Sequence, residues 1–229
     1  MFIIVFLCIV LILIANIYEL NIKNLKKIKQ FGEKNEKLDE IVNKYPSNID
    51  ICKYMLKMID NQSVEVEENK EYKNSLYIAI SNKIIIANIE NSFTRIQTIA
   101  HECLHSIQNR KKLRFNFVYS NIYLLYFIIV AILGIFNLIN NEIIYLFVFA
   151  IMGYLYYFIR SYLEDDAMIK AKYIAKEYME EMKISTKEEI DFVINTYNEM
   201  YEIGVPFTNS NLIIGTIIKT IILTIIFLI

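Results

Sequence analysis

The chain has 229 residues, 55% of them hydrophobic, and 24 Lys and Arg stand against 25 Asp and Glu. A net charge of −1 provides no general positive field, so we exclude nucleic acid as a partner. Three cysteines at unrelated spacings do not make a disulfide framework, and we expect Cys52 and Cys103 to be reduced thiols in a cytosolic compartment. The many Ile, Asn and Lys residues are typical of an AT-rich bacterial genome.

The apolar residues are gathered in four blocks, each near the roughly 17 to 25 residues that a membrane-spanning helix needs. The blocks are residues 1–18, 117–139, 143–162 and 211–229. A short polar sequence joins the middle two, which predicts a transmembrane hairpin over 117–162. The first block lacks a basic leading region and a small-residue cleavage site, so we interpret it as an uncleaved anchor.

Lys and Arg near the ends of the blocks predict which side of the membrane each connecting segment faces. Four Lys follow the first block, two Arg and two Lys precede the second, and the turn of the hairpin has neither. We therefore expect residues 19–116 and 163–210 to face the cytoplasm. Lys219 lies deep inside the last block, where an ionisable side chain is costly, and this makes it a functional candidate. The absence of a carboxylate partner within the last three blocks favours a lysine that packs against neighbouring helices or snorkels.

The cytoplasmic segments show alternating helix and strand signals. Before the second block the sequence predicts helices over 33–43 and 49–59, strands over 63–67, 76–80 and 83–89, and a helix over 91–109 that begins at Asn91 or Ser92. After the third block it predicts a helix over 163–182. A capping box at 185–189 then opens another helix, which we expect to end at Gly204-Val205-Pro206.

The helix expected over 91–109 carries the sequence His101-Glu102-Cys103-Leu104-His105. Residues four apart share a helix face, so His101 and His105 can reach one Zn²⁺, while Glu102 can hold the metal's water and take its proton. Such a pattern arises by chance in on the order of one chain in a hundred of this length. Both histidines of the chain lie in the motif, however, and the motif falls on a helix that follows a strand, which favours zinc binding.

A catalytic zinc needs a third protein ligand and an open position. The chain has no third histidine, so a cysteine or a carboxylate must serve. Glu164-Asp165-Asp166 follows the hairpin, which returns the chain to the face where the 91–109 helix ends. Glu164 is therefore a candidate, with Asp165 as its competitor. The alternative interpretation is a solvated acidic start of a helix, which the helix dipole favours.

The order of helix, short strands, motif, membrane hairpin and acidic segment resembles the YugP-like family of bacterial membrane zinc metallopeptidases. The residues that match are His101, Glu102, His105, Ile107, Gln108, Glu164, Asp166, Ala167 and Ala171. The resemblance implies that His101, His105 and Glu164 bind zinc, that Glu102 is the general base, and that Asp166 orients a ligand. The distantly similar HtpX-type peptidases have an Asp where this chain has Met168. Cys103-Leu104 departs from the family pattern, in which a small residue, commonly Gly, precedes the second His.

These observations together predict an α+β membrane protein with four transmembrane helices and a small cytoplasmic zincin-like unit of helices and a sheet. The expected function is a membrane-bound zinc endopeptidase that hydrolyses polypeptides at the cytoplasmic face. Two alternatives stay open: an intramembrane protease, and a non-enzymatic interaction protein derived from a peptidase. Polar residues that flank the motif disfavour the first, and the complete ligand set disfavours the second.

Overall fold

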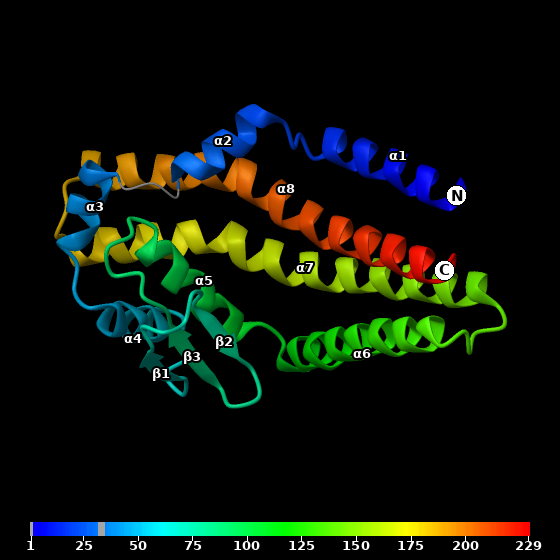
Figure 1. Cartoon of the computed structure of the whole chain (residues 1–229). Helices are drawn as coiled ribbons and strands as arrows, with labels where there is room; N and C mark the ends of the chain where they lie inside the picture. Colours follow the sequence, from blue (N-terminus) through cyan, green and yellow to red (C-terminus); the bar gives the residue numbers. More distant parts are fainter. Residues whose placement is uncertain (1, 32–34) are drawn as a thin grey trace. The chain divides into compact units, whose positions relative to one another are not determined.

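The computed structural model describes residues 2–31 and 35–229, a mostly helical chain with one small sheet (Figure 1). In chain order the described elements are α1 (Phe2–Ile17), α2 (Ile22–Phe31), α3 (Glu36–Asn43), α4 (Asn48–Met58), β1 (Glu65–Glu68), β2 (Leu76–Ile78), β3 (Lys83–Ile86), α5 (Arg95–Ile107), α6 (Arg110–Ile135), α7 (Glu142–Met182) and α8 (Lys187–Ile226). The start of the 33–43 helix at Glu33 lies outside the described residues, and its remainder is α3.

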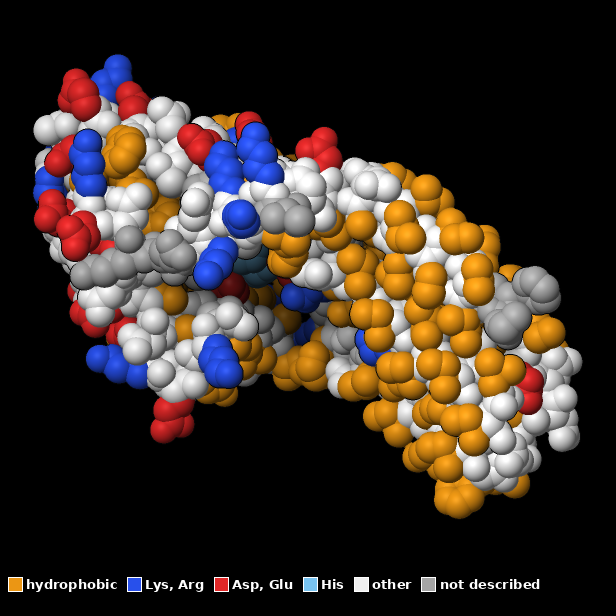
Figure 2. Space-filling model, turned by 45° about the horizontal axis from the view of Figure 1, so that its top comes forward, with side chains coloured by type: hydrophobic (Ala, Val, Ile, Leu, Met, Phe, Trp, Pro, Cys, Tyr) orange, Lys and Arg blue, Asp and Glu red, His pale blue; other side chains and the backbone are white. Residues whose placement is uncertain are grey.

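The chain divides into two compact units. The apolar unit comprises the described residues up to Lys26, Phe115–Tyr162 and Gly204–Ile229, and the polar unit comprises Lys27–Arg114 and Leu163–Ile203. Hydrophobic side chains dominate the visible surface of the apolar unit, whereas charged side chains gather on the polar unit (Figure 2). Helices α6, α7 and α8 are long and apolar enough to cross a membrane, and α1 is a shorter apolar helix.

Aromatic stacking and small residues hold the apolar unit together. The Tyr123 ring stacks on Phe149, with 4.9 Å between their centroids. Gly153 allows α7 to approach α8 closely, because an added Cβ would lie 2.2 Å from Cγ2 of Thr216. Lys219 lies with its Nζ 5.6 Å from the centroid of the Tyr123 ring, a cation–π contact in keeping with a packed lysine.

The expected end of a helix at Gly204-Val205-Pro206 is wrong, because α8 continues through Pro206 to Ile226. Pro206 cannot donate to the carbonyl of Glu202, and its ring crowds that carbonyl, which together cost about 3 kcal/mol. Its fixed φ is nevertheless close to the helical value, so the helix can continue through it. Just after Pro206 the side-chain hydroxyl of Ser210 donates to the backbone carbonyl of Phe207 (2.7 Å) within the same helix.

Two helices of the polar unit begin at side-chain caps. The Ser47 hydroxyl accepts from the backbone N–H of Asp50 (3.2 Å) and begins α4. Thr186 and Glu189 make a reciprocal capping box: the Glu189 N–H donates to the Thr186 hydroxyl (3.2 Å), and the Thr186 N–H donates to the Glu189 carboxylate (3.0 Å). Helix α5 begins at Arg95, later than expected, because Ser92 instead caps a turn by accepting from the N–H of Thr94 (3.3 Å).

The three strands form one sheet in the order β1-β3-β2. β2 and β3 pair antiparallel, with Tyr77 opposite Ile84, and they are shorter than the strands expected over 76–80 and 83–89. β1 pairs parallel with β3, with Glu65 opposite Lys83. β2 therefore lies at an edge of the sheet, on the side of β3 away from β1.

Helix α7 presents a row of small residues to the core of the polar unit. Ala167, Ala171 and Ala175 follow one another at helical spacing of four, and each is at most 1% exposed. They share this core with the apolar face of α5, which includes Ile96 and Ile99. Short side chains let α7 come close to its neighbours, which places the residue one turn earlier, at position 164, beside α5.

Candidate metal centre

The two histidines project from one face of α5. Its opposite, apolar face is buried in the core, which fixes the rotation of the helix. The Nε2 atoms of His101 and His105 are 3.0 Å apart, and the two rings are nearly perpendicular at 85°. Both side chains are largely buried, with 19% and 11% of their surface exposed.

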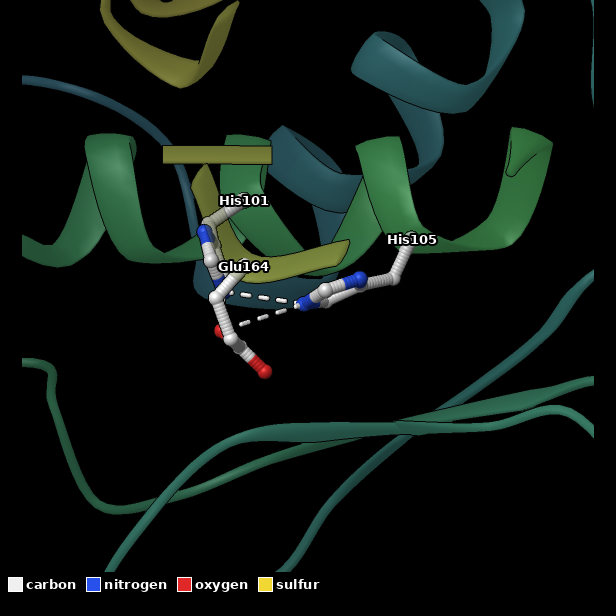
Figure 3. A group of neighbouring side chains, drawn as sticks. All are labelled: His101, His105 and Glu164. Atoms are coloured by element: carbon white, nitrogen blue, oxygen red, sulfur yellow. Dashed lines mark hydrogen bonds and ion pairs between the residues drawn. The ribbon is translucent and has the colours of Figure 1, made fainter. Parts of the chain in front are cut away.

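Glu164 reaches the same point from α7 (Figure 3). Its Oε2 lies 3.4 Å from Nε2 of His101 and 3.7 Å from Nε2 of His105. Ligand atoms held about 2.1 Å from a tetrahedral zinc lie about 3.4 Å from one another. Separations of 3.0 to 3.7 Å therefore fit a single ion with three protein ligands and one open position. The group could therefore hold a metal ion.

Glu102 is buried next to this group, between α5 and the sheet. It is 6% exposed, and burial raises the pKa of its carboxyl group. The charges of His101 and His105 and a backbone hydrogen bond from Tyr77 in β2 oppose that shift, whereas the charge of Glu164 adds to it. The carboxyl group of Glu102 therefore lies beside the three residues that could hold a metal ion.

The departure from the family pattern at Cys103-Leu104 is accommodated by the core. Both side chains are buried, and the Sγ of Cys103 lies 3.6 Å from the Sγ of Cys52 in α4. The contact with Cys52 and burial raise the pKa of the Cys103 thiol. Cys103 and Leu104 therefore anchor α5 in the core.

Gln108, the residue that caps the end of α5, connects His105 to α7. Its Nε2 donates to the carbonyl of Leu163 (2.8 Å) and to Oδ2 of Asp166 (3.1 Å), while its Oε1 lies 2.9 Å from Nδ1 of His105. Both partners of Nε2 are acceptors, so the amide has only one orientation that satisfies them. Oε1 must then accept from Nδ1–H, which leaves Nε2 of His105 with a lone pair toward Glu164 and His101.

Asp166 acts on this network at one remove. It accepts from Gln108, and its other oxygen is 2.5 Å from Nζ of Lys170, one turn further along α7. Asp166 is thus linked to His105 through Gln108, and its role in orienting a ligand stays a prediction. Asp165 is not part of the group of potential ligands found among residues 2–31 and 35–229, in which Glu164 is the carboxylate.

The charge of His105 responds to its surroundings in two opposing ways. Burial lowers its pKa, but the hydrogen bond and charge of Glu164, with smaller contributions from Glu102 and Gln108, outweigh burial and raise it overall. The imidazole is thus easily protonated while no metal competes for it.

The sequence predicted the grouping of His101, His105 and Glu164, which the structure shows. It did not predict the roles of Gln108 and of the Tyr77 backbone. The signal for Gln108 was its place three residues after His105, on the same face of α5, together with an amide that can donate and accept at once. Nothing in the local sequence of Tyr77 pointed to Glu102.

Comparison with models of protein families, with curated proteins and with solved structures finds no match to this chain. Inferences about its function therefore rest on its own geometry.

Proposed function

We propose that the chain is a zinc-dependent endopeptidase held in a cell membrane, with its site at the cytoplasmic face. The observation that carries this proposal is the convergence of His101, His105 and Glu164 beside the buried Glu102. A zinc ion bound there would supply a Lewis acid that activates water and polarises a substrate carbonyl.

Glu102 would take the proton from the attacking water and pass it to the leaving amine. Its raised pKa suits both steps, because a carboxyl group that holds a proton more readily is a better base and can still release that proton. Gln108 would keep Nε2 of His105 directed at the metal by accepting from Nδ1–H. Glu164 would complete the ligand set and leave one position open for water or substrate.

The sheet offers a place for an extended polypeptide. β2 is an edge strand, and its central residue, Tyr77, contacts Glu102 through the backbone. An extended chain that paired along β2 would therefore run past the base. This arrangement favours a polypeptide substrate over a small molecule.

The membrane assignment rests on the long apolar helices α6, α7 and α8, with α1 as a fourth and shorter span. The orientation follows from the Lys and Arg that flank these helices. Protease protection of a tag placed within residues 19–116 in inverted and right-side-out vesicles tests it, and accessibility from the outer side would reverse it.

Full-length protein purified in detergent tests the activity, with zinc content and cleavage of an unstructured protein measured together. The matched variant is Glu102→Gln, which keeps the size of the side chain. We expect bound zinc to remain and cleavage to fall by about 10²- to 10⁴-fold. An unchanged cleavage rate, or an unchanged cellular phenotype with this variant, would instead support a non-enzymatic role. Cleavage confined to transmembrane substrates would support an intramembrane protease.

A further inference from the structure

The turn between β2 and β3 carries an isolated apolar side chain. Ile80 is 62% exposed, more than the other exposed isoleucines of the polar unit, which are Ile107, Ile169 and Ile184. A single exposed aliphatic residue is ordinary by itself. The surroundings of Ile80 make it notable.

Hydrogen bonds hold this turn in one place. Oδ1 of Asn82 accepts from the Tyr77 hydroxyl (2.9 Å) and from Nη2 of Arg110 (2.7 Å), and Nδ2 of Asn82 donates to the carbonyl of Ser63 (2.9 Å). Asn82 has a positive φ of 54°, a conformation that asparagine tolerates better than most residues. The turn is therefore tied directly to Arg110, the first residue of α6.

Arg110 also begins a cationic segment. Arg110, Lys111, Lys112 and Arg114 are all exposed, and the apolar part of α6 starts at Phe115. Arg110 and Phe115 are about 7.5 Å apart along the helix axis. The headgroup layer on each side of a bilayer is about 5 to 8 Å thick. If α6 crosses the membrane, these cations and the turn bonded to Arg110 lie at the depth of the headgroups.

We propose that Ile80, Arg110, Lys111, Lys112 and Arg114 form a docking patch for an anionic phospholipid surface. Ile80 enters the interface, and the cations select anionic headgroups, each by about fivefold. Glu65 and Glu67 on β1 both form ion pairs with Lys83, so these three side chains together carry a net charge of −1, against the four cations of the patch. The patch keeps β2, and with it the backbone that contacts Glu102, at the membrane surface. The proposal rests on the membrane insertion of α6 and not on hydrolytic activity.

The chain has no tryptophan, so Ile80→Trp introduces a single fluorophore at the turn. The matched control is Tyr72→Trp, because Tyr72 is also exposed and follows the end of β1 that pairs with the far end of β3. Full-length variants are reconstituted in phosphatidylcholine vesicles that contain phosphatidylglycerol, with bromine on the acyl chains of one lipid at a time. We expect strong quenching of the tryptophan at position 80 and little at position 72.

The charge arm compares brominated phosphatidylglycerol with brominated phosphatidylcholine at the same mole fraction. We expect several-fold stronger quenching at position 80 by the anionic lipid. The preference should fall when Lys111, Lys112 and Arg114 become Gln, because only the contribution of Arg110, which is kept to hold the turn, then remains. Equal quenching at positions 72 and 80, or equal quenching by the two lipids, would overturn the proposal. So would quenching at position 80 that a bound unstructured polypeptide abolishes, since that would make the turn a substrate contact. None of these readouts requires bound zinc or cleavage, so a failed peptidase assay leaves them interpretable.

Discussion

Replacing Gln108 with Leu tests the geometry of the metal centre at the contact that the sequence did not reveal. The variant keeps the approximate size of the side chain but removes its amide. His105 loses the acceptor for Nδ1–H, and two acceptors on α7, the carbonyl of Leu163 and the carboxylate of Asp166, lose a donor. The imidazole of His105 can then carry its proton on Nε2, the atom that faces Glu164 and His101.

The expected loss of zinc affinity follows from the role of the Gln108 amide in orienting the His105 ring. Loss of a group that orients a histidine ligand weakens metal binding by about 10- to 100-fold, which is about 1.4 to 2.7 kcal/mol. The carbonyl of Leu163 belongs to a helix, and Asp166 keeps its contact with Lys170, so neither acceptor is left wholly unsatisfied. We therefore expect the loss to appear mainly in zinc affinity and only weakly in the free energy of unfolding.

The assay is competition for zinc between the full-length protein in detergent and a chelator of known affinity. A second readout is the ¹⁵N spectrum of protein labelled at histidine, since the chain has only two. Metal-free wild-type protein at a pH where His105 is neutral should show its proton on Nδ1, and Gln108→Leu should shift it toward Nε2. Gln62→Leu, at an exposed turn, is the matched control. Unchanged zinc affinity and an unchanged tautomer in a folded Gln108→Leu protein would refute the reasoning. Asp166→Asn, which keeps an acceptor for Gln108, should have a smaller effect.

Three further predictions concern the ligands, the pH and the packing. Glu164→Gln should weaken zinc binding by more than ~100-fold, which exceeds the loss expected when a group that only orients a ligand is removed. Asp165→Asn should leave zinc affinity nearly unchanged in the same chelator competition. The opposite pattern would make Asp165 the ligand. Zinc affinity measured between about pH 5 and 8 should fall as the pH falls, by up to about tenfold per unit for each proton displaced. The fall should begin above pH 6.5, the ordinary value, because the pKa of His105 is raised. The free energy of unfolding of the metal-free protein should depend on pH in the opposite direction. The contribution of His105 to that free energy is fully present below pH 6.5 and is lost as the pH rises through the raised pKa. A free energy of unfolding that did not change over this range would contradict the contact of His105 with Glu164. Ala171→Leu should overpack the contact of α7 with the core, cost about 1 to 3 kcal/mol and lower the melting temperature, whereas Lys170→Leu, at an exposed neighbour, should not.

Local patterns in the sequence predicted the parts of the fold that local forces determine. The apolar blocks predicted three of the long helices, with the first block forming the shorter α1. The Thr186–Glu189 capping box and the β2–β3 hairpin form where the residues predicted them. The parallel pairing of β1 with β3 joins segments 18 residues apart in register, and no local pattern reports such a contact. Helix α2 was not predicted, and the continuity of α8 through Pro206 depends on a balance that proline's usual role does not reveal.

The residues of the metal centre also fall into those that local sequence patterns predicted and those that only the packing of the fold determines. The spacing of His101 and His105 is local, because a helix places residues four apart on one face, so the sequence was enough to pair them. Glu164 was within reach of reasoning because the histidine count required another kind of ligand and the hairpin returned the chain to the same side. The contacts of Gln108 with Leu163 and Asp166 join residues 55 and 58 positions apart in the sequence and depend on how closely α5 and α7 approach. That approach depends in turn on the alanines of α7, which read in sequence only as good helix formers. The sequence spacing was thus enough to predict the residues that would bind the metal, whereas the residues that orient them depend on how the helices pack.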